Sequence, residues 1–149
     1  MKDIIMVLVL SVAPISELRG AIPYGVSQGI HPLEATLIAV LGNALIVPIL
    51  YFVLRPVFTF LKGFEPIKDL VHAYERRAES KIKSYEKYRF LGLVLLVGIP
   101  LPTTGVYTGV VASHVLGMPA KSSIAANIIG VCISGTIVFL LTSGVLKFF

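Results

Sequence analysis

The chain has 149 residues, of which 56% are hydrophobic and only 14% are charged, and its mean hydropathy is +0.89. A soluble domain of this size could not keep so much apolar surface away from water, so the composition excludes a soluble globular protein and indicates an integral membrane protein. The net charge is +5, and the single cysteine, Cys132, excludes an intramolecular disulfide and a cysteine-based zinc site. Because Cys132 lies in an apolar run, we expect a buried structural thiol.

The first predicted element is a short apolar run at residues 4–13. A helix of about ten residues climbs about 15 Å, half the hydrocarbon thickness of a bilayer, so this run should end near the middle of the membrane. The segment PISELRGAIPYG follows it. Pro14 and Pro23 remove backbone donors and Gly20 tolerates a sharp reversal, so the sequence predicts a break in the helix here.

Glu17 and Arg19 lie inside this break. A charge at bilayer depth costs at least about 2.5 to 3.5 kcal/mol on insertion scales, so such residues pair with each other or face a cavity. One interpretation is a structural ion pair that holds the turn. The other gives the residues separate roles: Arg19 presents its planar guanidinium to an anionic group such as phosphate, and Glu17 takes and releases a coupling proton.

Residues 33–54 form the next element, which is apolar for long enough to span a bilayer. The following segment, residues 55–89, carries nine of the thirteen Lys and Arg residues and five of the eight acidic residues. Basic loops stay in the cytoplasm, and the interspersed acids argue against a nucleic-acid partner. Residues 66–89 have apolar side chains at helical spacing, which predicts an amphipathic interfacial helix. This helix either only connects the flanking segments or gathers anionic headgroups.

A second short apolar run, FLGLVLLVGI, ends in the same way at the segment PLPTTGVYTG. Pro100, Pro102 and Gly105 supply the predicted break. Thr103 and Thr104 precede a predicted half helix, where they can cap free backbone N–H groups or, with the helix N-terminus, form part of an anion site.

Residues 122–146 form the second apolar segment that is long enough to span the membrane. Pro14 and Pro100 stand at equivalent points of the two halves, and so do Pro32 and Pro119, at nearly the same separation. The sequence therefore contains an internal repeat of one unit: half helix, break, half helix, turn and full helix.

We predict a single membrane domain with repeat 1 at residues 1–54, the basic connector at 55–89 and repeat 2 at 90–149. If each broken segment crosses the membrane, the two units are parallel and both termini are cytoplasmic. If each broken segment turns back as a re-entrant hairpin, the units are inverted and both termini lie outside. The length of the broken segments favours the inverted arrangement, in which the breaks meet near the midplane beside a polar cavity.

Four polar or aromatic residues recur in the two halves. Tyr24 and Tyr107 each follow a break and either line the cavity or pack in the core. Asn43 and Asn127 lie in the predicted spanning helices, where an amide side chain forms hydrogen bonds between helices.

Small residues with a spacing of four, at Ala126, Gly130 and Ser134, permit close helix packing within the protein or between protomers. The three histidines are scattered along the chain, so no metal site is predicted. Nothing in the sequence resembles a nucleophile with its base, a phosphate-binding loop or a redox motif, so we predict neither catalysis nor a cofactor.

The motifs SELRGAIP at residues 16–23 and GIPLPTTGVYTG at residues 98–109 together resemble the family of small multidrug export proteins. The resemblance covers nearly the whole chain. That family is similar in architecture to the DedA-type membrane proteins, which share two re-entrant hairpins, each followed by a membrane helix. The positions that match the two hairpin motifs are Glu17, Arg19, Gly20, Pro100, Pro102, Thr103, Thr104 and Gly105.

The resemblance implies either export of drugs or, from the DedA-type relatives, movement of phospholipids and the polyprenyl phosphate carrier with the help of the proton-motive force. This sequence departs from the DedA pattern because its second hairpin has no acidic residue. Glu17 would therefore have to act alone in any proton relay.

We interpret the chain as an all-α transporter in the cell membrane that acts on an amphipathic, anionic, lipid-like substrate and that can be coupled to protons. Arg19, Thr103, Thr104, Tyr24 and Tyr107 are the predicted substrate-binding residues. Membrane lipids and a second copy of the chain, in a dimer, are the expected partners. The alternatives are an exporter of amphipathic cations in exchange for protons and a scaffold that transports nothing.

Overall fold

The computed structural model describes residues 1–65, 68–69 and 82–148, and all the regular secondary structure in these ranges is helical. This confirms the predicted all-helical class. The helices are α1 (Lys2–Val12), α2 (Glu17–Ser27), α3 (Pro32–Lys62), α5 (Ile82–Gly98), α6 (Val106–Val115) and α7 (Ala120–Phe148).

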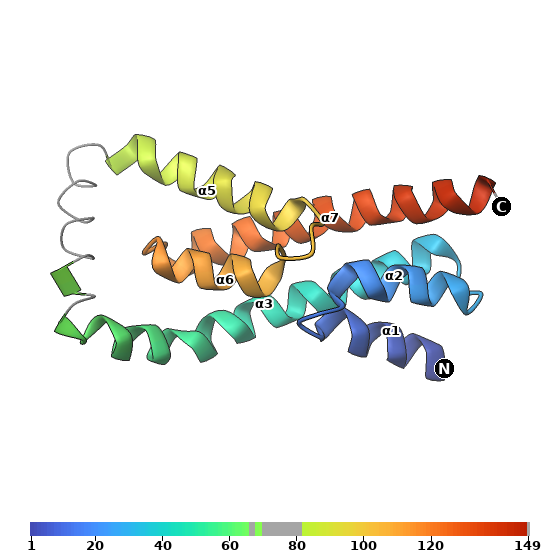
Figure 1. Cartoon of the computed structure of the whole chain (residues 1–149), viewed down its shortest axis with the longest axis horizontal. Coiled ribbons are helices and arrows are strands. Elements are labelled where there is room, and N and C mark those ends of the chain that lie inside the picture. Colours follow the sequence, from blue (N-terminus) through green and yellow to red (C-terminus); the bar gives the residue numbers. More distant parts are fainter. Residues whose placement is uncertain (66–67, 70–81, 149) are drawn as a thin grey trace.

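The helices form two halves that run in opposite directions along the molecule (Figure 1). α1 runs from the end that holds the N-terminus towards the middle, α2 returns to that end, and α3 runs to the opposite end. α5 then runs back towards the middle, α6 returns to the end from which α5 came, and α7 runs to the end that holds the C-terminus. We call α1 and α2 the first hairpin and α5 and α6 the second hairpin. Their bends lie near the middle of the molecule.

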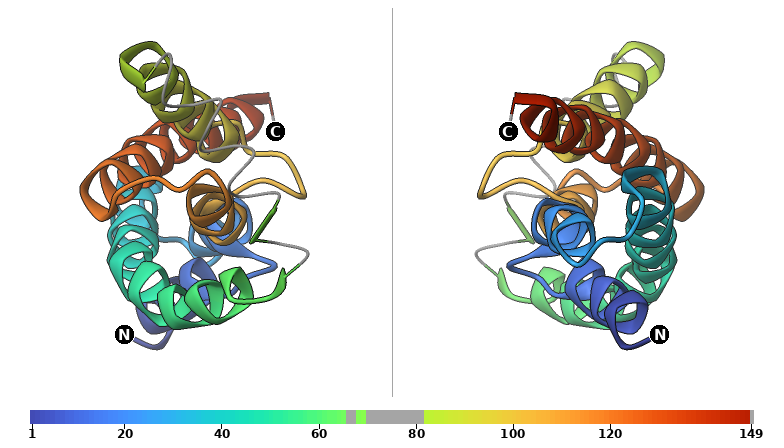
Figure 2. Two further views of the ribbon diagram at one scale, coloured as in Figure 1. Left: turned by 90° about the vertical axis from the view of Figure 1, so that its left-hand side faces the viewer. Right: turned by 90° about the vertical axis from the view of Figure 1, so that its right-hand side faces the viewer.

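The second arms of the two hairpins occupy the centre of the bundle. In views along the long axis, α2 and α6 overlap near the centre, and the other helices lie around them on all sides except the one that the two bends flank (Figure 2). Each of these helices begins at the bend of its hairpin, so their N-terminal ends face each other near the middle. Free backbone N–H groups from both hairpins are therefore directed towards one region.

The hydrophobic core surrounds these two central helices. Its largest fully buried side chains include Ile22 of α2, Val106 and Val110 of α6, and Val47 of α3. Such aliphatic side chains fill the space between helices without leaving polar atoms unpaired.

Each hairpin also packs through its first arm on a glycine of the long helix in its own half. A Cβ atom at Gly42 of α3 would overlap the hydroxyl of Ser11 in α1. A Cβ atom at Gly130 of α7 would overlap Val97 in α5. The two halves therefore achieve close helix packing by the same means, which is a small residue at the point of contact.

The two long helices are those that can span a membrane. Pro32–Lys62 and Ala120–Gly144 have mean hydropathies of 2.5 and 2.3, and both exceed the length of about 20 residues that a bilayer core requires. Leu37, Leu41 and Leu45 of α3 are all more than half exposed, as expected for a helix whose outer face contacts lipid.

The predicted connector is described only at its two ends. α3 continues past residue 54 to Lys62 despite Pro56, and residues 82–89 belong to α5, which continues into the second apolar run without interruption. The rest of the predicted amphipathic helix, residues 66–67 and 70–81, lies outside the described residues.

Two packing predictions have definite outcomes. Cys132 is exposed on α7, so the prediction of a buried thiol is wrong, because an apolar run in a membrane helix can face lipid as readily as the core. Ala126, Gly130 and Ser134 are all buried, and Gly130 packs on α5. The small residues therefore serve packing within the chain.

Candidate functional site at the contact between the two bends

The first bend, residues 13–16, turns the chain from α1 into α2. The hydroxyl of Ser16 donates a hydrogen bond to the Leu10 carbonyl at 2.9 Å, which ties the bend to the end of α1. Glu17 begins α2 with φ of 45°, a conformation that residues other than glycine rarely adopt. This local departure from regular helix geometry explains why Glu17 and Arg19, two positions apart, can reach each other.

The second bend, residues 99–105, is held by the side chain of Thr104. Its hydroxyl accepts a hydrogen bond from the Leu101 N–H at 3.0 Å and donates one to the Ile99 carbonyl. The helix α6 has Gly105 as its N-cap residue, with no hydrogen bond from a side chain at the cap. The prediction that the threonines cap this helix is therefore wrong, because Thr104 forms its bonds within the bend.

Glu17 reaches across to the second hairpin. Its side chain is only 8% exposed, and its carboxylate lies against the backbone N–H groups of Val106 and Tyr107. A Cβ atom at Gly105 would overlap this carboxylate. The first turn of α6 therefore receives its negative partner from the other half of the molecule, which is the favourable charge for a helix N-terminus.

Arg19 forms a second link between the hairpins. Its Nη2 atom donates a hydrogen bond to the Thr104 carbonyl at 2.7 Å and lies 3.7 Å from Oε2 of Glu17. The side chain is 23% exposed, so part of the guanidinium surface remains accessible. Arg19 thus contacts its neighbouring acid and the second bend with the same nitrogen.

Tyr107 provides a third link, in the opposite direction. Its hydroxyl, on the first turn of α6, donates a hydrogen bond to the Val12 carbonyl at the end of α1. This bond satisfies a carbonyl that the helix itself leaves unpaired at its C-terminal end. Side chains of each hairpin therefore bond to the backbone of the other hairpin. The charged side chains at this contact belong to the first hairpin.

The structure brings together some of the predicted substrate-binding residues and separates others. Arg19, Thr104 and Tyr107 meet at the contact between the bends. Thr103 is exposed in the second bend, where its carbonyl accepts a hydrogen bond from the Thr108 hydroxyl. Tyr24 lies farther along α2 and packs against the core, the second of the two roles proposed for it.

Four of the six residues at which the sequence predicts a helix break lie in the bends, and two do not. Pro14 lies in the first bend, and Pro100, Pro102 and Gly105 lie in the second. Pro23 instead lies inside α2, so the break predicted at that position is wrong. Gly20 also lies inside α2, so the break predicted there is wrong as well. A Cβ atom at Gly20 would meet the Ser16 hydroxyl, so this glycine permits the close return of the chain after the bend.

The two asparagines of the long helices differ in their contacts. Asn43 donates a hydrogen bond from its amide to the Ser11 carbonyl at 2.9 Å, and so joins α3 to α1 as predicted. Asn127 instead donates its amide hydrogen bond to the Ser123 carbonyl of its own helix, which differs from the predicted bond between helices. Its side-chain oxygen packs against Gly109 of α6.

Sequence reasoning did not find the backbone groups at the contact. The Val12 carbonyl and the N–H of Val106 are present in every residue of these types, so no sequence pattern marks them. Among the described residues, no group of three or more His, Cys, Asp or Glu side chains could hold a metal ion.

The fold and this contact define a helical membrane protein with two apolar helices long enough to span the bilayer and two hairpins joined through charged and polar groups. The chain belongs to the family described as "Putative small multi-drug export protein", whose sequence model matches residues 17–137. The matched region begins at Glu17 and includes Arg19 of the first hairpin and Thr104 and Tyr107 of the second. The description is that of an export protein, not of an enzyme. No curated protein and no solved structure matches the chain.

Proposed function

We propose that this protein is a secondary transporter that moves an amphipathic, anionic, lipid-like substrate, a phospholipid or a polyprenyl phosphate, and couples this movement to protons through Glu17. One observation carries the proposal. The Glu17 carboxylate lies beside Arg19 and the N–H groups of Val106 and Tyr107, which are the groups that would bind an anionic headgroup.

The chemistry of these groups suggests how coupling would work. A guanidinium and a helix N-terminus both favour a phosphate, but here an internal carboxylate already lies against them. Protonation of Glu17 would remove its negative charge and leave Arg19 and the first turn of α6 for the headgroup. Headgroup binding and protonation would then favour each other, since coupling between two binding events is reciprocal.

The same contacts also join the two hairpins. A headgroup that displaced Glu17 would loosen the link to α6, and one that engaged Arg19 would weaken its bond to the Thr104 carbonyl. We therefore propose that substrate and proton together control the separation of the bends. Helix N-termini that meet near the midplane are a feature of substrate sites in secondary transporters.

The proposed function includes a membrane arrangement. The hairpins would be re-entrant, the two halves would be inverted repeats, and the architecture would be similar to that of the DedA-type proteins. Residues 55–89 would lie in the cytoplasm and both termini outside in a multi-pass protein of the cell membrane. The opposite directions of the two halves and the position of both termini at one end support this arrangement (Figure 1).

We also propose a homodimer, because two hairpins and two spanning helices provide limited walls for a substrate path. Membrane lipids would be the other constant partners. The surface of α3 that carries Leu37, Leu41 and Leu45 would contact lipid or the second copy.

Transport in proteoliposomes tests the substrate class. Vesicles would contain the purified protein and either a fluorescent phosphatidylglycerol or a labelled polyprenyl phosphate, and movement between leaflets would be followed by quenching from outside. The wild type should accelerate movement, Arg19→Ala should abolish the acceleration, and Glu17→Gln should make the rate independent of a pH gradient. Equal rates in protein-free, wild-type and Arg19→Ala vesicles would refute the proposal and favour a scaffold.

The family description favours a second candidate, an exporter of amphipathic cations in exchange for protons. In this mechanism a cation would take the place of Arg19 beside the Glu17 carboxylate. Drug-driven proton flux should then be lost in Glu17→Gln and retained in Arg19→Lys. The lipid mechanism instead predicts weaker transport in Arg19→Lys, because an ammonium lacks the planar fork of a guanidinium.

A further inference from the structure

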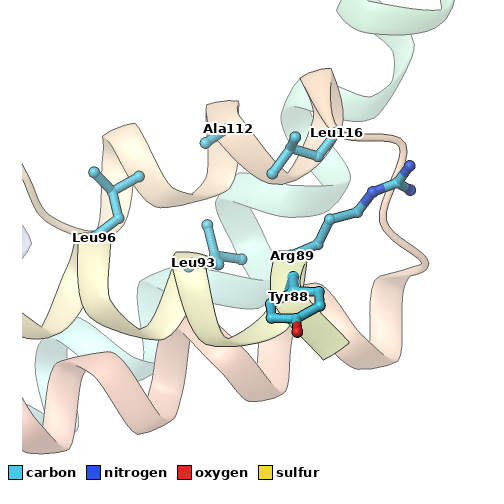
Figure 3. A pocket seen from close by; sticks show the side chains of 7 residues that line it. Tyr88, Arg89, Leu93, Leu96, Ala112 and Leu116 are labelled. Atoms are coloured by element: carbon cyan, nitrogen blue, oxygen red, sulfur yellow. The ribbon is translucent and has the colours of Figure 1, made fainter. Parts of the chain in front are cut away.

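A groove lies along the two arms of the second hairpin, where they pack against each other, and shares no residue with the contact between the bends. Its volume is about 390 Å³, within the range of roughly 300 to 1,000 Å³ that is typical of small-molecule sites. Figure 3 shows the side chains that line it. They come from α5 and α6: Tyr88, Arg89, Gly92, Leu93, Leu96, Ala112 and Leu116.

The walls of the groove are aliphatic and one of its ends is polar. Leu93 and Leu96 of α5 face Ala112 and Leu116 of α6 (Figure 3). Tyr88 and Arg89 lie together at one end, and the Arg89 side chain extends past Leu116 (Figure 3). The groove therefore has an apolar surface and a polar surface, which together match an amphipathic molecule.

The sequence places the polar end at the level of lipid headgroups. Arg89 is the last charged residue before the apolar run that forms the rest of α5. Tyrosine and arginine side chains at such a boundary lie in the interfacial layer of a bilayer. The groove then extends from the headgroup layer into the hydrocarbon, and its Leu96 end approaches the second bend.

Charge at this end favours an anionic headgroup. Among the residues whose side chains the structure describes at this end, Glu86 and Lys87 are exposed, and with Arg89 these residues carry two positive charges and one negative charge. In a two-fold contact a second copy of the chain would present residues of the same net positive charge, whereas an anionic headgroup presents the opposite charge. The charge balance thus favours a lipid over a second protein chain.

We propose that this groove binds an acyl chain of an anionic phospholipid from the cytoplasmic leaflet, with the headgroup beside Tyr88 and Arg89. The inference rests on the proposed function for the cytoplasmic position of this end. The bound lipid would lie with its headgroup at the interface and its chain directed towards the second bend.

Gly92 allows the site to be filled without disturbing the fold. A Cβ atom at Gly92 would meet no atom within 4 Å, and the same is true of Gly144 in α7, which lines no part of the groove. Gly92→Leu is therefore the variant that blocks the groove, and Gly144→Leu is its matched control. Both remove a helix glycine and add the same apolar side chain.

Native mass spectrometry of the delipidated protein, titrated with phosphatidylglycerol and phosphatidylcholine of the same chain length, tests the site. In the wild type and in Gly144→Leu we expect more adducts with phosphatidylglycerol than with phosphatidylcholine. In Gly92→Leu we expect an affinity about tenfold lower, the change that corresponds to lost burial of roughly two methylene groups.

Equal binding by all the variants, or no preference for phosphatidylglycerol, would overturn the inference. A loss of dimer in Gly92→Leu with unchanged lipid adducts would assign the groove to a second copy and also overturn it. Failure of the transport proposal is a separate result: phosphatidylglycerol binding that is sensitive to Gly92→Leu, without any protein-dependent lipid movement, would leave the lipid site standing.

Discussion

The carboxylate of Glu17 occupies the space into which a side chain at Gly105 would project, so a charged residue of the first hairpin depends on a glycine of the second. Gly105 has φ of 145° and ψ of −168°, a combination that is essentially confined to glycine. The backbone conformation and the packing across the contact therefore both require glycine at position 105.

Gly105→Ala should consequently destabilise the protein. The backbone strain alone should cost on the order of 1 to 3 kcal/mol, and displacement of the Glu17 carboxylate should add to it. Thermal unfolding in detergent, compared with wild type, measures the loss. Gly144→Ala is the control and should leave the midpoint unchanged or slightly raised, because its Cβ atom meets open space. A midpoint for Gly105→Ala equal to that of the control would contradict the geometry of the second bend.

Arg19→Met should destabilise the contact by removing the guanidinium while keeping an apolar stem. Loss of a hydrogen bond from a charged group costs about 1.5 to 3 kcal/mol, and Glu17 would also lose its cationic neighbour. Unfolding midpoints would be measured for Arg19→Met, Glu17→Gln and the double variant. The double variant should lose less than the two single variants together, because a neutral glutamine in place of Glu17 no longer needs a cation.

The matched control for this series is Arg55→Met, which removes an exposed arginine from α3. It should change the midpoint very little. Strictly additive losses in the double variant would show that Glu17 and Arg19 do not interact energetically.

Tyr107→Phe should weaken the contact between α6 and α1 by the value of one hydrogen bond. The Tyr107 hydroxyl bonds to the Val12 carbonyl, and the net loss should be about 0.5 to 1.5 kcal/mol. Tyr24→Phe is a suitable comparison, because Tyr24 also packs beside the core but contributes only its carbonyl to the hydrogen bond with Ser27. Denaturation in detergent should separate the two variants, and equal stabilities would argue against the bond to Val12.

Both termini should react with a membrane-impermeant maleimide added to intact cells. The test uses single cysteines at Lys2→Cys and Phe149→Cys in a Cys132→Ala background, with Lys68→Cys as the cytoplasmic position. α3 ends at Lys62, at the end of the molecule opposite both termini (Figure 1), and the N–H of Lys68 bonds to the Phe64 carbonyl just beyond it, so Lys68→Cys should react only after the membrane is permeabilised. Labelling of Lys68→Cys in intact cells and of neither terminal cysteine would reverse the proposed orientation. Labelling at only one terminus would refute the inverted arrangement.

Hydropathy and the lengths of the apolar runs were sufficient to predict the apolar helices, because both are properties of a short stretch of sequence. The apolar runs of α3 and α7 exceed the thickness of a bilayer, and those of α1 and α5 end at proline-containing bends. The precise roles of single residues were less predictable. Pro23 continues a helix, and Thr104 supports a bend instead of capping α6, since both outcomes depend on how neighbouring backbone groups are already paired.

The sequence by itself determined that the chain is a helical membrane protein and that an interruption between helices occurs next to Glu17 and Arg19. It placed both charged residues inside the interruption, whereas the structure has them in the first turn of α2. Only the tertiary structure decided what these charges contact. Glu17 lies against the first turn of α6 and Arg19 bonds to the Thr104 carbonyl, far away along the chain. The partners on the second hairpin are backbone N–H and C=O groups. Every residue carries both, except proline, which lacks the N–H. Their identity could not be read from residue types, because it depends on which part of the folded chain approaches the charges.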